Sequence, residues 1–191
     1  MDWIIFGLVA VWLGMISWFD IRKKEIPHSL WVIIPFVGAG AYRLWQGEWP
    51  FVLIAILVAT VSERERISQL FGWQELRRIL TWIPLLFLGT YFSIQTSPLA
   101  TISIVGFWIA WELKWWGGAD AVSAIILILI FPERNLIIAF FAVHLISVLV
   151  LTTRSYLKTE KIGLHRMAGL PLLFVTFLLY QTGRFFLIPR V

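Results

Sequence analysis

Residues 3–20 read WIIFGLVAVWLGMISWFD, and no charged side chain interrupts this stretch before Asp20. A straight helix needs about 17 or more apolar residues to cross a bilayer, so residues 3–19 are long enough to span one. Nothing in the stretch resembles a signal peptide with a small-residue cleavage site. The sequence therefore predicts a permanent transmembrane helix that ends at an aspartate.

The composition of all 191 residues agrees with a membrane environment. Hydrophobic residues make up 60% and charged residues 14%, with a mean hydropathy of +0.85. Soluble domains are about 25% charged, and a chain of this size cannot hide so much apolar surface in a core. Six tryptophans near the ends of apolar runs suit interfacial belts, namely Trp3, Trp18, Trp45, Trp49, Trp115 and Trp116.

Seven further apolar runs follow the first. They are Leu30–Trp45, Pro50–Ser62, Ile79–Ile94, Leu99–Leu113, Asp120–Phe131, Asn135–Leu151 and Leu170–Ile188. A turn is expected at Gln46-Gly47-Glu48, a polar amphipathic loop at Glu63–Arg78, and a polar, basic segment at Thr152–Arg166. Lipid cannot satisfy open backbone groups, so the runs must be helical. We expect an all-α, polytopic transmembrane helical bundle of about eight helices (six to eight), forming a single domain over residues 1–191.

The distribution of basic residues gives the orientation. With the N-terminus outside and eight crossings, the loops inside would hold Arg22, Lys23, Lys24, Arg64, Arg66, Arg77, Arg78, Lys114, Arg154, Lys158, Lys161 and Arg166. The outer segments would hold Arg43, Arg134, Arg184 and Arg190. This bias follows the positive-inside rule. The net charge of +5 is spread over short loops, so no nucleic-acid partner is expected.

Several kinds of chemistry have no residues to support them. Cysteine is absent, which excludes disulfides, thiol nucleophiles and cysteine-based metal sites. The three histidines, His28, His144 and His165, lack the spacing of metal ligands. We expect neither a metal nor a cofactor.

Two aspartates are the strongest candidates for a function, because ionisable groups at membrane depth are costly. Asp20 ends the first run and Asp120 begins the sixth, so the topology places both at the inner side and at the same depth. Two nearby carboxylates share a proton, and such a pair can hydrolyse a peptide bond by acid–base catalysis. The alternative is structural: Asp120 could cap its helix, and Asp20 could pair with Arg22, Lys23 or Lys24.

The flanking residues favour the catalytic interpretation. Asp20 lies in FDIRKKEIPH (residues 19–28), and Asp120 lies in WGGADA (residues 116–121). Paired glycines allow positive φ and a close approach of the backbone to a substrate or another helix, although helix crossings also use them. Together the two segments resemble the prepilin peptidase family of membrane aspartyl peptidases with a Gly-x-Gly-Asp motif. The second segment is similar to the archaeal preflagellin peptidase variant, and Leu170-Pro171 resembles the family's late proline-led helix.

The resemblance implies a function and a site. Asp20 and Asp120 map onto the two catalytic aspartates and Gly117 onto the motif glycine, with Gly118 and Glu112 as supporting or substrate-binding residues. The implied activity is removal of the short basic leader from type IV pilin-like or archaellin-like precursors. It would act at the cytoplasmic face of a prokaryotic plasma membrane. A basic leader would meet acidic residues on the inner face, namely Glu25, Glu63, Glu65, Glu75, Glu112 and Glu160.

Departures from the family pattern keep alternatives open. Val122 stands where many members carry lysine, Ala119 replaces the commoner glycine, and four helices rather than two separate the aspartates. The alternatives are an inactive homologue in pilus or archaellum assembly, a small ion-coupled transporter, and a protease resembling signal-peptide peptidase. Glu112 could instead pair with Lys114 or another cation, and His144 could be a proton relay but fits a packing role better.

The loop at residues 67–78 could be an interfacial amphipathic helix or a gate for substrate.

Overall fold

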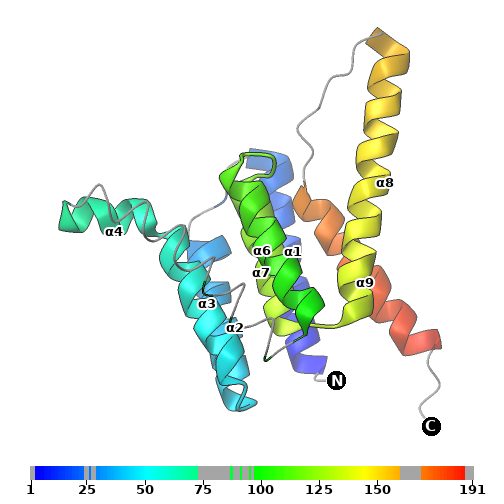
Figure 1. Ribbon diagram of the computed structural model, residues 1–191. Helices are drawn as coiled ribbons and strands as arrows, with labels where there is room; N and C mark the ends of the chain where they lie inside the picture. Colours follow the sequence, from blue (N-terminus) through cyan, green and yellow to red (C-terminus); the bar gives the residue numbers. More distant parts are fainter. Residues whose placement is uncertain are drawn as a thin grey trace. The chain divides into compact units, whose positions relative to one another are not determined.

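The computed structural model describes residues 3–23, 26, 29–72, 87, 91, 95, 97–159 and 169–187, and every regular element in these ranges is a helix (Figure 1). The prediction of an all-α fold is confirmed for this part of the chain. Two compact units are present. The first comprises Met1–Ile26 with Asn135–Val191, and the second comprises Pro27–Arg134.

The first unit contains α1 (Trp3–Lys23), α8 (Arg134–Thr159) and α9 (Gly169–Leu187), of which α1 and α9 pack together. The Phe6 and Phe177 rings lie 5.4 Å apart between centroids. Further along α1, a Cβ on Gly14 would lie 3.5 Å from the ring of Phe174. Because the partner number falls as the α1 number rises, α1 and α9 are antiparallel. The end of α1 and the start of α9 therefore lie at the same end of the pair.

Helix α1 has a buried face and an exposed face, and both are apolar. Val9, Leu13 and Ile16 are buried at the three- and four-residue spacing of one helix face. The opposite face exposes large apolar side chains, namely Ile4, Leu8, Val11, Met15 and Trp18. Among the described residues, α1 is the helix both long and apolar enough to cross a membrane.

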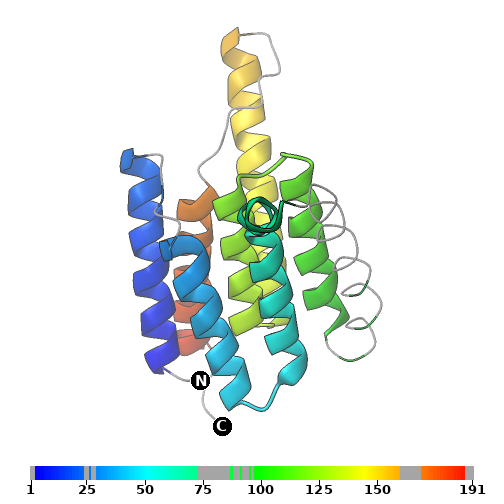
Figure 2. The ribbon, with the colours of Figure 1, turned by 90° about the vertical axis from the view of Figure 1, so that its left-hand side faces the viewer.

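The second unit contains a π-helical turn η1 (Ser29–Ile33), α2 (Ile34–Trp45), α3 (Trp49–Ser62), α4 (Arg64–Phe71), α6 (Pro98–Glu112) and α7 (Gly118–Ile130). Helices α2 and α3 form a hairpin, as do α6 and α7 (Figure 2). Gly47 has φ +75 in the predicted turn between α2 and α3, a conformation that favours glycine. Helix α7 packs against η1, α2, α3 and α6, and its residues from Ala121 to Ile130 are all buried.

Most predicted helices are confirmed. The bounds of two segments differ from the prediction, and one predicted helix lies almost entirely outside the described residues. Residues 64–71, within the predicted loop at 63–78, form helix α4 with Gly72 as the C-cap residue, which agrees with the alternative of an amphipathic helix from residue 67. Helix α8 continues past the apolar run to Thr159. The predicted run Ile79–Ile94 lies outside the described residues, apart from positions 87 and 91. Phe87 and Tyr91 are helical there and stack with centroids 5.5 Å apart.

Candidate functional site

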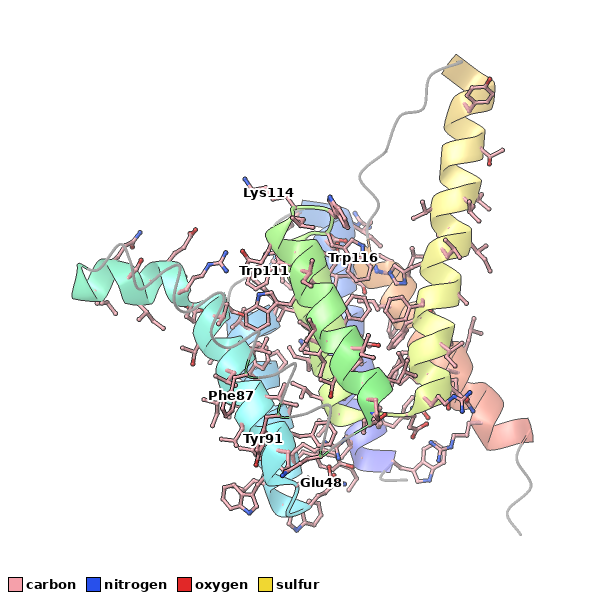
Figure 3. All side chains as sticks on the ribbon, in the orientation of Figure 1. Glu48, Phe87, Tyr91, Trp111, Lys114 and Trp116 are labelled. Atoms are coloured by element: carbon pink, nitrogen blue, oxygen red, sulfur yellow. The ribbon has the colours of Figure 1, made fainter. Side chains whose placement is uncertain are left out.

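The second unit has two distinct ends. Arg64 pairs with Glu112, which joins the start of α4 to the end of α6 beside the start of α7. We call this the Asp120 end. Arg43 near the end of α2 donates hydrogen bonds to the carbonyls of Leu129 and Ile130 at the end of α7, which defines the Arg43 end. Figure 3 shows Trp111, Lys114 and Trp116 at the first end and Glu48 at the other.

Asp120 lies in the first turn of α7, at the third helical position after the N-cap residue Gly117. A carboxylate in the first turn is favoured by the positive end of the helix dipole. Asp120 is half-buried, whereas the residues that follow it are buried completely. The carboxylate is therefore held at the boundary between the packed interior of the unit and its surface.

Gly117 and the Asp120 side chain occupy the same small space. A Cβ added to Gly117 would lie 3.0 Å from Oδ2 of Asp120, which is closer than almost all real Cβ contacts. The carboxylate thus folds back over the glycine that precedes its helix. Any side chain larger than that of glycine at position 117 would enter the space that the Asp120 carboxylate occupies.

Gly118 is confined from the other side. A Cβ at this position would lie 2.9 Å from Nε1 of Trp111, in the last turn of α6. From the sequence, two explanations of the glycine pair were possible: a positive φ, or a close approach of the backbone to another group. Gly117 has φ −64 and Gly118 is helical, so positive φ is not used. Close approach is what these glycines provide.

The turn between α6 and α7 is built around Lys114, which has φ 58. The Lys114 N–H donates to Trp111 O at 2.9 Å, and the Trp115 N–H donates to Ala110 O at 2.9 Å. This is the hydrogen-bond pattern of a Schellman motif, in which glycine usually holds the left-handed position. A lysine at this position costs about 1 kcal/mol or more. The Trp116 ring then stacks on Phe107 with centroids 4.8 Å apart.

Glu112 has a cation partner that the sequence did not identify. Arg64, far away in the sequence, forms the ion pair with Glu112, and its guanidinium lies 5.5 Å from the Trp111 ring centre. The two side chains are largely buried, with 14% and 24% of their surfaces exposed. The expected pairing of Glu112 with a cation is confirmed, but the cation comes from α4 rather than from the neighbouring Lys114.

Asp20 lies in the last turn of α1, and its Oδ2 atom is buried. The basic residues that follow it lie along the helix surface. The Arg22 guanidinium is 4.6 Å from the Trp18 ring centre, and the Lys23 ammonium is 5.2 Å from that of Phe19. Because α1 and α9 are antiparallel, the start of α9 lies at the same end of the first unit as Asp20.

The structure gives each aspartate a defined place in its own unit, Asp20 in the first and Asp120 in the second. The predicted meeting of the two carboxylates therefore stays a prediction.

His144 is buried on α8, and its Nδ1 lies 2.8 Å from Phe140 O. This contact agrees with the packing role favoured by the sequence. Within the ranges that the structure describes, no three His, Asp or Glu side chains gather to form a metal site.

Comparisons of the chain with protein-family models, with curated proteins and with solved structures found no match.

Proposed function

We propose that this chain is a membrane aspartyl endopeptidase of the prepilin and preflagellin type. It removes the short basic leader of pilin-like or archaellin-like precursors at the cytoplasmic face, with Asp20 and Asp120 as the catalytic pair. The observation that carries the proposal is the fit of the Asp120 carboxylate over Gly117. This fit gives a steric reason for glycine at the position that the family resemblance assigns to its motif glycine.

Two carboxylates are sufficient for the reaction. One ionised carboxylate takes a proton from water as the water oxygen bonds to the scissile carbonyl carbon, while the protonated partner donates its proton to the carbonyl oxygen. The resulting tetrahedral intermediate collapses when the C–N bond breaks: the first carboxyl gives its proton to the amine nitrogen, and the second, now ionised, takes a proton from a hydroxyl of the intermediate. Close carboxylates favour this sequence because they cannot both ionise, so the pair carries one shared proton.

Exposed apolar side chains support a multi-pass location in the membrane. Six of the described helices present such side chains outward, among them Ile4 and Leu8 on α1, Val37 on α2, Ile56 on α3, Ile102 on α6, Leu145 on α8 and Leu179 on α9. Soluble proteins rarely expose apolar surface of this extent. Exposed tryptophans also lie near both ends of the second unit, Trp115 at the Asp120 end, and Trp45 and Trp49 at the Arg43 end. Such belts are typical of the two membrane interfaces.

The basic residues support the orientation within each unit. Arg64, Arg66 and Lys114 belong to the Asp120 end of the second unit, and Arg22 and Lys23 follow Asp20 at the end of α1. The positive-inside rule places such residues in the cytoplasm. Each aspartate therefore lies at the end of its own unit that the rule assigns to the cytoplasm.

The short helices are compatible with this location. The 13 residues of α7 rise about 20 Å, less than the roughly 30 Å of a typical hydrocarbon core. Burial along its length shields α7 from contact with lipid. The outer helices of the second unit, which are also short, can be accommodated by local thinning of the bilayer or by snorkelling of flanking side chains.

A cleavage assay tests the proposal. The purified protein in lipid is incubated with a panel of prepilin-like and prearchaellin-like precursors, and loss of the leader is followed by gel shift and mass. We expect cleavage by the wild type and its loss in both Asp20→Asn and Asp120→Asn. Glu133→Gln, a carboxylate change beyond the opposite end of α7, should cleave normally. Cleavage that survives either aspartate change contradicts the proposed pair.

An inactive homologue in pilus or archaellum assembly is the second candidate. Val122, at the position where many family members carry lysine, is completely buried in α7. A lysine there would bring a charge into the packed interior of this unit, which is costly. If no precursor is cleaved, while the aspartate variants fold as the wild type does, this second candidate is favoured.

A further inference from the structure

Helix α4 stands apart from the packed helices of the second unit. It follows α3 after the single residue Glu63 and runs across the direction of α3 (Figure 1). In Figure 2, where α3 and α6 run along the page, α4 is seen along its own axis. Among the described residues, α4 contacts α3, from which it departs, and reaches α6 through the Arg64–Glu112 pair. Glu65, Arg66, Gln69 and Leu70 are exposed, so this side of α4 faces the surroundings.

The open helix is amphipathic. Ile67 and Leu70 are three residues apart and share one face, because successive helical residues are rotated by about 100°. Glu65 and Gln69 share the other face and are exposed. Leu70 is 82% exposed, among the highest values of the large apolar side chains. Water is an unfavourable environment for this face.

The charges of α4 are compensated locally. Arg64 is paired with Glu112, and the Arg66 guanidinium lies 3.5 Å from the carboxylate of Glu63. Little positive charge remains to attract anionic lipids. Attraction of α4 to a surface would therefore come from its apolar face.

The position of α4 in the unit indicates the surface that it meets. The preceding helix α3 exposes Leu53 and Ile56 along its length, a face that suits lipid tails. Helix α4 begins where this apolar face ends, at the level of Lys114 and Trp115 near the start of α7. A helix that turns across the bundle at this level lies in the plane of the membrane surface.

We propose that α4 is a membrane-surface helix, with Leu70 seated at the boundary between lipid headgroups and acyl chains on the Asp120 side. The occupant of its apolar face is the bilayer itself, at the depth usual for interfacial helices. Through the Arg64–Glu112 pair, the helix would hold the start of α7, and with it Asp120, at the headgroup level. The inference rests on the proposed membrane location but not on peptidase activity.

The absence of cysteine allows single-site labelling of the full chain in lipid. Leu70→Cys, its neighbour Gln69→Cys and Val11→Cys on α1 are each labelled with an NBD fluorophore in phosphatidylcholine nanodiscs. Quenching by spin-labelled lipid and by aqueous iodide is then compared. We expect lipid quenching at position 70 to exceed that at position 69 several-fold, with the opposite order for iodide. The values should not change when phosphatidylglycerol is added or salt is raised.

Each outcome has a distinct meaning. Equal iodide quenching at positions 70 and 69, together with lipid quenching at position 11, overturns the surface helix while the membrane location stands. Iodide quenching at position 11 overturns the membrane location and the surface helix with it. Lipid quenching at position 70 that requires phosphatidylglycerol overturns the apolar origin of the contact.

Discussion

At position 117, glycine leaves open the space that the Asp120 carboxylate occupies. The 3.0 Å separation between Asp120 Oδ2 and a Cβ built on Gly117 leaves no room for a larger side chain unless the carboxylate moves. Gly117 has an ordinary φ of −64, so alanine would meet no backbone strain there. A change at this position should therefore act on the carboxylate rather than on the backbone.

Gly117→Ala is expected to lower precursor cleavage at least tenfold while the unfolding temperature in detergent changes little. The displaced carboxylate would lose its position relative to the scissile bond, and small displacements of catalytic groups are costly. The matched control is Gly106→Ala on α6, where a Cβ meets nothing within 4 Å. Equal activity of the two variants would show that the space over Gly117 has no role in catalysis.

The sequence indicated the aspartates and glycines but not the contacts that explain them. Asp20 and Asp120 are conspicuous because ionisable groups at membrane depth are costly. The crowding of Gly118 by Trp111 depends on the turn at Lys114, a lysine in a conformation usually held by glycine. No local pattern predicts that conformation for lysine, so the geometry of the turn could not be derived from the sequence.

At the scale of elements, Arg43 closes the far end of α7. Its Nε donates to Leu129 O at 2.5 Å and its Nη2 donates to Ile130 O at 3.0 Å. Glu48 pairs with the same guanidinium, which also lies 4.6 Å from the Phe51 ring centre. The last carbonyls of a helix have no partner within the helix. Arg43, on α2, supplies hydrogen-bond donors to these carbonyls, and only 4% of its surface is exposed.

Arg43→Met is expected to destabilise the protein by roughly 1–3 kcal/mol, because it leaves two carbonyls buried without a donor. Thermal unfolding in detergent measures the effect. Arg66→Met serves as the control, since the Arg66 side chain is 63% exposed and its loss should change stability little. Equal shifts for the two variants would contradict the capping role of Arg43.

The Arg64–Glu112 pair allows a double-mutant cycle between α4 and α6. Arg64→Met and Glu112→Gln should each lower stability by about 1 kcal/mol, and the double variant should cost less than the sum. If Glu112 is structural, Glu112→Gln retains cleavage of the precursors. A large loss of cleavage with unchanged stability would instead assign Glu112 to the substrate.

The sequence predicted most helices but missed features that depend on tertiary contacts. The apolar runs predicted α1, α3, α6, α7 and α9 almost to their ends. The segment that contains α4 is interpreted from the sequence as a polar loop or, from residue 67, an amphipathic helix, because its alternation of charged and apolar residues contains no apolar run. Arg43 was expected only as a basic residue on the outer side, since its carbonyl partners on α7 are distant in the sequence.

At the scale of the whole molecule, both units follow one plan. In each unit, two antiparallel helices have an aspartate and basic residues at the same end. These are Asp20 with Arg22 and Lys23 in the first unit, and Asp120 with Lys114 in the second. The positive-inside pattern of the sequence anticipates this plan, because loop charge depends on connectivity alone. How two such units join depends on side-chain packing, for which the sequence has no simple periodic signal.

The proposed catalytic pair requires that Asp20 and Asp120 lie close together, and cross-linking tests this proximity directly in a chain without cysteine. Asp20→Cys/Asp120→Cys is treated in lipid with a short bifunctional maleimide, and the linked species is detected by gel and intact mass. Phe6→Cys/Phe177→Cys, whose native rings lie 5.4 Å apart, is the positive control, and Asp20→Cys/Glu48→Cys is the negative control. We expect linkage of the 20/120 pair and none of the 20/48 pair. Failure of the 20/120 pair to link, while 6/177 links, would contradict a shared catalytic site.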